Sequence, residues 1–158
     1  MLSTLKELRE SRKVTQKQAA EIAGVSLRTY ATYENDPAKA STRQYRFILQ
    51  DLSDALRIDE EHGLLTVDEI TSCCSRVFTD YKIDFCYLFG SYAKGKATAK
   101  SDVDLLVATE ETGLKFYGIA EQLREELHKK VDLLDFRQLK ENPDLTYEIM
   151  KDGIRIYG

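Results

Sequence analysis

The stretch LFGSYAKGKATAKSDVDLLV, residues 88–107, decides the fold of the second half of the chain. It runs from apolar residues through a loop of small and basic residues into a second apolar run, which predicts a strand, a loop and another strand. Gly90 and Ser91 open the loop, and Asp102 and Asp104 stand where the chain becomes hydrophobic again. Two acids in a strand that otherwise looks buried require a chemical reason.

The two acids predict a cation site. Side chains at alternate positions of a strand share a face, so Asp102 and Asp104 are expected about 7 Å apart on one side of the sheet. Ionised carboxylates this close raise each other's pKa unless a cation neutralises them. Mg²⁺ takes oxygen ligands from one or two carboxylates together with substrate phosphates. Asp132, in the later stretch KKVDLLD, can complete a site for two magnesium ions.

The loop between the two strands carries residues suited to phosphate. Gly90 lets a backbone approach phosphate closely, and Ser91 adds a hydroxyl and an amide at a helix start. Lys94, Lys96 and Lys100 can neutralise a triphosphate or a pyrophosphate leaving group. A glycine-serine pair alone would be read as a tight turn. Joined to the acids and to the strands on both sides, it favours a nucleotide site.

These residues resemble the minimal nucleotidyltransferase family, which has a palm fold of the DNA polymerase β type. The resemblance is carried by Gly90, Ser91, Ala93, Gly95, Ser101, Asp102, Asp104 and Leu105, with KKVDLLD and EIMKDGIRIY further along the chain. It implies that Gly90 and Ser91 bind the triphosphate of ATP, the substrate, and we predict Lys94 and Ser101 of the same loop as further nucleotide-binding residues. It also implies that Asp102, Asp104 and Asp132 hold two Mg²⁺ ions, and that Asp132 assists as general base for an acceptor hydroxyl.

Residues 1–58 predict a separate all-α domain. Apolar residues recur at helical spacing, with Ser3, Thr15 and Ser26 as N-caps and a last helix over about residues 42–56. Gly24 can end a helix in the left-handed conformation. The chain has a small residue at Ala20, a glycine at Gly24 and a bulky residue at Tyr30. This spacing is typical of two helices that cross steeply with a large side chain packed between them.

The stretch LKELRESRKVTQKQAAEIAGVSLRTYATYEN resembles the phage-repressor (Cro/C1) helix-turn-helix family. The resemblance implies that the helix over residues 26–35 enters the major groove of double-stranded DNA. Its candidate DNA contacts are Gln16, Gln18, Leu27, Arg28, Thr29 and Thr32. Arg9 and Glu34 resemble the structural ion pair of that family. The alternative is a protein-docking module that no longer binds DNA, since the basic excess of this half is modest.

Charge and hydropathy divide the chain in two. Residues 1–58 hold ten Lys and Arg against seven Asp and Glu, a net charge of +3, and residues 59–158 hold thirteen against twenty, a net charge of −7. A basic front half can meet nucleic acid, whereas an acidic back half repels phosphate unless metal ions intervene. Residues 59–66 interrupt the helical pattern and predict a linker. Residues 67–158 predict an α/β domain with a mixed sheet, its strands near residues 83–89, 102–108, 130–136 and 154–157.

Composition restricts the setting of the protein. No apolar run approaches the ~18 residues of a membrane span, and the N-terminus lacks the apolar core of a secretory signal. Three cysteines without metal-site spacing predict reduced thiols and a cytoplasmic protein. Arg57 and His62 match the R-x4-H spacing of some helical ribonucleases, but that pair crosses a helix end. His128 closes a helix, where a cation suits the dipole, and has no second metal ligand nearby.

The family resemblance implies attack of an acceptor hydroxyl on the α-phosphate of a nucleoside triphosphate. Relatives that modify antibiotics or tRNA carry an extra domain for the acceptor, so here we expect a macromolecular acceptor. Stand-alone members commonly act as antitoxins that transfer AMP to a tyrosine of a HEPN-type toxin, and antitoxins often repress their own operon. The leading hypothesis is therefore a Mg-dependent protein adenylyltransferase antitoxin that binds DNA, as a homo-oligomer or a hetero-complex.

Two alternatives stay open. One is a transcriptional regulator whose transferase-like domain only senses nucleotide or docks a partner. The other is a nucleotidyltransferase that acts on a small molecule or an RNA end.

Overall fold

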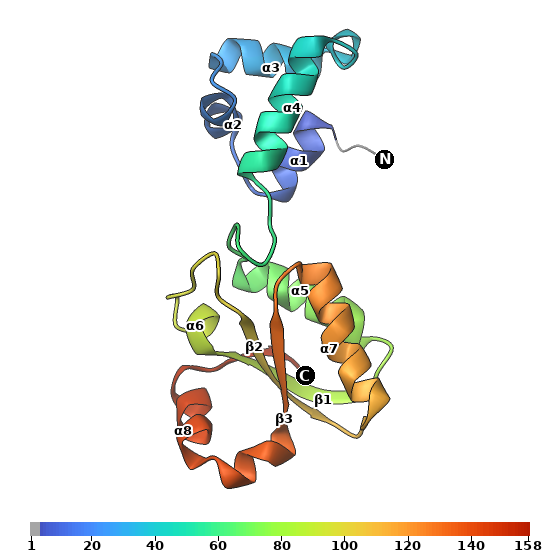
Figure 1. Cartoon of the computed structure of the whole chain (residues 1–158), viewed down its shortest axis with the longest axis vertical. Coiled ribbons are helices and arrows are strands. Elements are labelled where there is room, and N and C mark those ends of the chain that lie inside the picture. Colours follow the sequence, from blue (N-terminus) through green and yellow to red (C-terminus); the bar gives the residue numbers. More distant parts are fainter. Residues whose placement is uncertain (1–3) are drawn as a thin grey trace. The chain divides into compact units, whose positions relative to one another are not determined.

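The computed structural model describes residues 4–158, which divide into two compact units, residues 4–57 and residues 58–158 (Figure 1). Each unit has its own hydrophobic core. Within the described part of the chain, no helix combines the length and the apolar character needed to cross a bilayer.

The first unit is all-α. Its elements are α1 (Leu5–Ser11), α2 (Gln16–Ile22), α3 (Leu27–Asn35), a 3₁₀ turn η1 (Pro37–Lys39) and α4 (Arg43–Ala55). The predicted caps Thr15 and Ser26 are confirmed, because their hydroxyls accept hydrogen bonds from backbone amides of the first helical turn. Thr4 caps α1, and Ser3 lies outside the described residues. Gly24 has φ +64°, the predicted left-handed turn, and Tyr30 is fully buried between the helices.

The second unit is an α/β domain with a mixed sheet, as the sequence predicts. Its elements are α5 (Val67–Phe78), β1 (Ile83–Phe89), α6 (Gly90–Ala93), β2 (Val103–Thr109), α7 (Leu114–Leu127), β3 (Val131–Asp135), the 3₁₀ helix η2 (Phe136–Glu141), α8 (Pro143–Asp152) and β4 (Ile154–Tyr157). The strands are ordered β3-β2-β1-β4. β1 runs antiparallel to β2 and β4, while β2 and β3 are parallel.

The sheet has two differently covered faces (Figure 1). Val103, Leu105 and Val107 of β2 are buried in the main core, together with residues of α5 and α7. The alternate positions of β2 face the other way, where Leu106 packs with Phe89 of β1 and Ile149 of α8. Asp104 belongs to this second set, so the strand that builds the core also presents an acid on the α8 face.

Two predictions of local structure are wrong, and one helix was not predicted. The helical spacing of residues 114–128 predicts that Tyr117 points inward, but Tyr117 is 71% exposed, because the buried stripe of α7 passes through Ile119 and Leu123 instead. β2 begins at Val103, one residue later than predicted, and the amide of Val103 donates to the carbonyl of Lys130, the residue before β3 (2.9 Å). The helix η2 was not expected, and it begins where Asp135 caps the turn that ends β3.

Candidate active site

Asp104 lies at the centre of the candidate site. Its Cα is paired with that of Phe89 in β1 and that of Asp132 in β3. Asp104 and Asp132 are therefore level on adjacent parallel strands, about 4.8 Å apart along the hydrogen-bonding direction, with side chains on the same face. Asp102 is exposed and precedes the first residue of β2, so it stands at the loop–strand junction and not within the strand as expected.

Gly90 packs directly against Asp104. A Cβ atom added to Gly90 would lie 2.1 Å from Asp104 Oδ2, and the φ of Gly90 is +71°. Both facts require glycine at this position, because any side chain would meet the carboxylate and strain the backbone. The glycine-serine turn and the acid, fourteen residues apart in sequence, thus form one small site.

The acids of this site oppose each other's ionisation. Burial raises the pKa of Asp104 to about 6, and the charges of Asp132, Asp102 and Glu148 contribute in the same direction. The carboxylates of Asp102, Asp104, Asp132 and Glu148 therefore lie near one another, on the face of the sheet that α8 covers. Such an arrangement favours a bound cation, which would lower the pKa of Asp104 again.

Glu148 is the site residue that sequence reasoning missed. It lies in α8, and its Oε1 accepts an ion-paired hydrogen bond from Nζ of Lys94 at 2.5 Å. The signal in the sequence is weak: Glu148 precedes Ile149, the apolar residue of α8 that packs beside Phe89. That neighbour becomes informative only once the sheet face covered by α8 is known.

Oxygen ligands suited to Mg²⁺ are present, although they do not form a finished cage. The acids supply carboxylates only, the donor type that Mg²⁺ prefers. Within residues 4–158, no three His, Cys, Asp or Glu side chains are grouped so as to hold an ion by themselves. The donor set fits a magnesium ion that takes its remaining ligands from substrate phosphates and water.

The loop between α6 and β2 is held by backbone and side-chain bonds. Ser101 Oγ accepts a hydrogen bond from the Thr98 amide (2.8 Å), so this predicted nucleotide ligand closes a turn in the structure. Lys129 is fully buried and donates from Nζ to the carbonyls of Ala99 (2.5 Å) and His62 (3.1 Å). It fixes the loop to the segment that opens the second unit.

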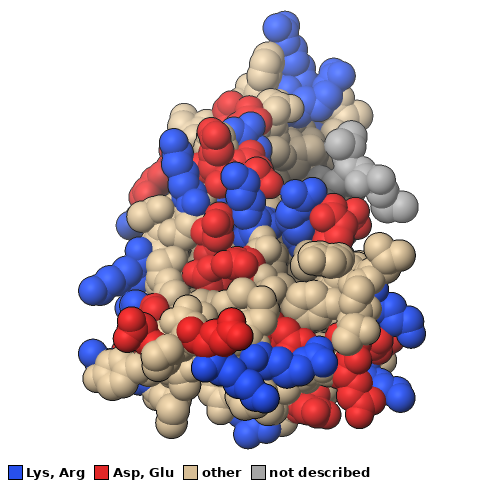
Figure 2. Space-filling view, turned by 60° about the horizontal axis from the view of Figure 1, so that its bottom comes forward, with Lys and Arg blue, Asp and Glu red and all other residues tan. Residues whose placement is uncertain are grey.

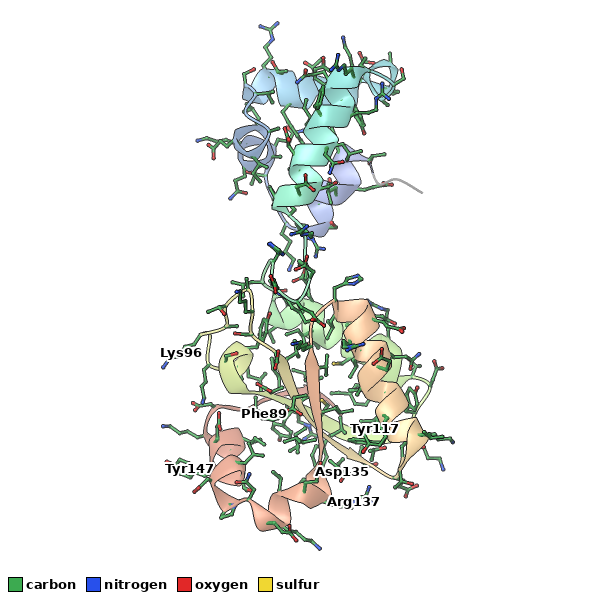
Figure 3. All side chains as sticks on the ribbon, viewed as in Figure 1. Phe89, Lys96, Tyr117, Asp135, Arg137 and Tyr147 are labelled. Carbon is green, nitrogen blue, oxygen red and sulfur yellow. The ribbon has the colours of Figure 1, made fainter. Side chains whose placement is uncertain are left out.

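The loop lysines differ in their surroundings. Lys94 forms an ion pair with Glu148. Lys96 extends away from the domain (Figure 3). On the face drawn in Figure 2, Lys and Arg are interspersed with Asp and Glu. Among the described residues, this face therefore shows no large patch of a single charge sign.

The predicted DNA-contact residues lie around α2 and α3 of the first unit. Leu27, Arg28 and Thr32 of α3 are exposed, and Thr29 is half-buried with its hydroxyl accepting from Ser26 Oγ at 2.8 Å. Gln18 completes the capping box of α2 with Thr15. These side chains share one pair of consecutive helices, as the resemblance requires.

A buried ion pair fixes the position of α3. Glu34 has a side chain only 1% exposed and accepts from Arg9 Nε and Nη2, both at 2.8 Å. Gln16 Nε2 donates to the same carboxylate at 3.1 Å, so this candidate DNA contact is also part of the network. Donation from Arg9 lowers the pKa of Glu34. The predicted structural pair of Arg9 and Glu34 is confirmed.

Comparison with known proteins identifies the second unit. The family model described as "Polymerase beta, Nucleotidyltransferase" matches residues 72–158, which is more than half of the chain. The chain belongs to the polymerase beta nucleotidyltransferase family. A helix-turn-helix model matches residues 5–61. The nucleotidyltransferase expected from the sequence, joined to an N-terminal helix-turn-helix, is therefore confirmed.

Curated relatives and solved structures match the nucleotidyltransferase part. A Methanocaldococcus jannaschii protein provisionally named protein adenylyltransferase MJ0128 is 40% identical over 78 residues, covering 48% of this chain and 79% of that protein. Protein adenylyltransferase MntA of Shewanella oneidensis is 30% identical over 79 residues, covering 49% and 55% respectively. A crystal structure of a toxin-antitoxin with AMP-PNP has a TM-score of 0.49 at 26% identity, over 56% of this chain and 73% of that chain.

Proposed function

We propose that this nucleotidyltransferase transfers AMP from ATP to a hydroxyl group of a partner protein. The observation that carries the proposal is the contact between Gly90 and Asp104, with Asp132 level beside them. It puts the predicted phosphate turn and two predicted metal ligands within one site. The relatives named protein adenylyltransferases support a protein as acceptor.

Each residue of the site has a proposed part in the reaction. Gly90 and Ser91 bind the triphosphate through the backbone, and Lys94 and Ser101 lie on the loop that follows. Asp102, Asp104 and Asp132 would hold Mg²⁺, which when bound supplies charge neutralisation at the phosphates. Asp132, exposed at the edge of the site, accepts the proton of the acceptor hydroxyl. The hydroxyl oxygen then bonds to the α-phosphorus as the bond to pyrophosphate breaks.

The acceptor that we propose is a tyrosine of a HEPN-type toxin, as the family resemblance of residues 88–107 implies. The chain would then be the antitoxin of the pair and would form a hetero-complex with it. The three cysteines, all free and buried, suit the reducing cytoplasm in which such a pair would act.

The test is transfer of label. The protein is incubated with α-³²P-labelled ATP, Mg²⁺ and the product of the neighbouring gene, beside a D102A/D104A variant. We expect label on the partner, localised to tyrosine by mass spectrometry, and none with the double variant. An unlabelled partner, or equal labelling by the double variant, would contradict the proposal. Label on a small molecule or an RNA end in place of protein would favour the other transferase hypothesis.

We also propose that the first unit binds double-stranded DNA through α3. The support is that Leu27, Arg28 and Thr32 are exposed on a helix whose other face is fixed by the Glu34 network. Gln16, Gln18 and Thr29 would add contacts at the helix ends. Autoregulation of the operon follows if the DNA is the upstream region of its own gene.

A mobility-shift titration with that upstream DNA tests the second proposal. Arg28→Ala should weaken binding by roughly 1–3 kcal/mol and relax the sequence preference. Binding should fall steeply with salt, because phosphate contacts release counter-ions. Salt-insensitive or absent binding would leave a protein-docking module as the role of this unit.

A further inference from the structure

The pair formed by Lys94 and Glu148 stands out from the ion pairs of the second unit. Its two side chains come from α6's C-cap and from α8, 54 residues apart in sequence, and each is 34% exposed. Lys94 follows Gly90 by one helical turn, and its amide donates to the Gly90 carbonyl at 3.1 Å. The lysine is therefore fixed beside the turn that we assign to the triphosphate.

Glu148 has a charge that is unfavourable for the proposed substrate. It belongs to the group of acids around Asp104, and a triphosphate brought to Gly90 would add several further negative charges. A carboxylate beside a polyanion opposes binding unless a cation masks it. Lys94 provides that mask in the nucleotide-free protein, and the pair is neutral as a whole.

Partial exposure makes this pair exchangeable. Separating a fully buried pair is costly because each charge is left without water or a partner, whereas the charges of a pair one-third exposed to water are solvated once they part. A triphosphate offers Lys94 more negative charge than one carboxylate does. Lys94 can therefore change partner at small cost.

We propose that Glu148 is the counter-ion of Lys94 when no nucleotide is bound. When ATP binds, Lys94 moves from Glu148 to the triphosphate, and it pairs with Glu148 again as pyrophosphate leaves. Glu148 is thus a positioning residue that competes with the substrate for one lysine. This inference rests on the proposed nucleotidyl transfer. The inference adds a role for Glu148, an acid of the last helix of the domain: this residue limits the affinity for ATP and favours release of pyrophosphate.

Isothermal titration of the full chain with ATP and with AMP, both in Mg²⁺, tests the exchange. E148Q should bind ATP about two- to fivefold more tightly, the size expected for a partly exposed charge pair. K94M should bind ATP more weakly by a similar factor. AMP lacks the β- and γ-phosphates, so its affinity should change less than twofold in either variant. E125Q, the same substitution on the exposed side of α7, is the matched control and should leave both affinities unchanged.

The outcomes separate this inference from the proposed function. Unchanged or weaker ATP binding by E148Q, with wild-type ATP binding intact, overturns the counter-ion role alone. Equal changes for ATP and AMP also overturn it, because a general loosening of the site would act on both ligands. If the wild-type protein binds neither ligand, the proposed transferase function falls together with the inference. Circular dichroism melts of E148Q and K94M verify that each variant is folded.

Discussion

At the scale of single residues, Asp104 shows how a position in the proposed active site opposes stability. It is half-buried on a strand whose neighbours Val103 and Leu105 are fully buried, and burial with nearby acids raises its pKa to about 6. An ordinary unfolded aspartate has a pKa near 3.9. The folded protein therefore binds this proton more tightly than the unfolded chain does, and ionised Asp104 destabilises the fold.

Asp104→Asn should stabilise the metal-free protein in a pH-dependent way. The penalty is absent near pH 3, where Asp104 is largely protonated in both states, grows between the unfolded pKa of about 3.9 and the folded pKa of about 6, and is complete above pH 6. We expect the variant to gain about 1 kcal/mol of unfolding free energy at pH 7.5 and almost nothing near pH 3, after allowing for solvent screening. Urea melts in EDTA measure it. A gain of equal size at both pH values would show that charge is not the cause.

At the scale of elements, the β1–α6 turn depends on one glycine. Gly90→Ala places a methyl group where Asp104 Oδ2 lies and forces a left-handed φ on a residue with a side chain. We expect a loss of about 2 kcal/mol in unfolding free energy, combining strain and displacement. Transferase activity should fall at least as far as in D102A/D104A. Gly95→Ala is the matched control, since its φ is also positive (+68°) but the added Cβ meets no atom within 4 Å.

The α6–β2 loop depends on Lys129 in a similar way. Lys129→Met keeps the length of the side chain but leaves the Ala99 and His62 carbonyls without this donor. We expect faster amide hydrogen exchange in residues 94–102 and a loss of about 2 kcal/mol, typical of hydrogen bonds to a charged group. Lys130→Met, an exposed neighbour, should change neither quantity. Faster exchange in both variants would indicate a general effect of charge removal.

Elements with strong local signals were predictable, and contacts between distant elements were not. β1, the start of α8 at Asn142-Pro143 and the caps of α2 and α3 follow from residues close in sequence. The juxtaposition of Asp104 with Asp132 follows from two similar strands, VDLL in both, once they pair in parallel. Glu148 and Lys129 were not predicted, because their partners are distant in sequence. The partner of Glu148 lies 54 residues away, and the two partners of Lys129 lie 30 and 67 residues away, on segments whose packing no local pattern encodes.

At the scale of the whole molecule, two cores without a shared residue are joined in one chain. The first unit closes around Tyr30 and the Arg9–Glu34 pair, and the second around its sheet. The first unit is small, so removing one partner of its buried ion pair costs a large part of its stability. The unfolding free energy of each unit should therefore change only with substitutions in its own core.

Arg9→Met and Leu88→Ala test that independence. Arg9→Met leaves Glu34 buried without its main partner, which costs about 3 kcal/mol, and should lower the melting temperature of the first unit by 10 °C or more. Leu88→Ala removes a fully buried side chain from the sheet and should lower only the transition of the second unit, by about 2–5 kcal/mol. Differential scanning calorimetry should resolve two transitions, each moved by one variant. A single transition moved by both would mean that the two cores unfold as one cooperative unit, and DNA binding and transferase activity would then be lost together on heating.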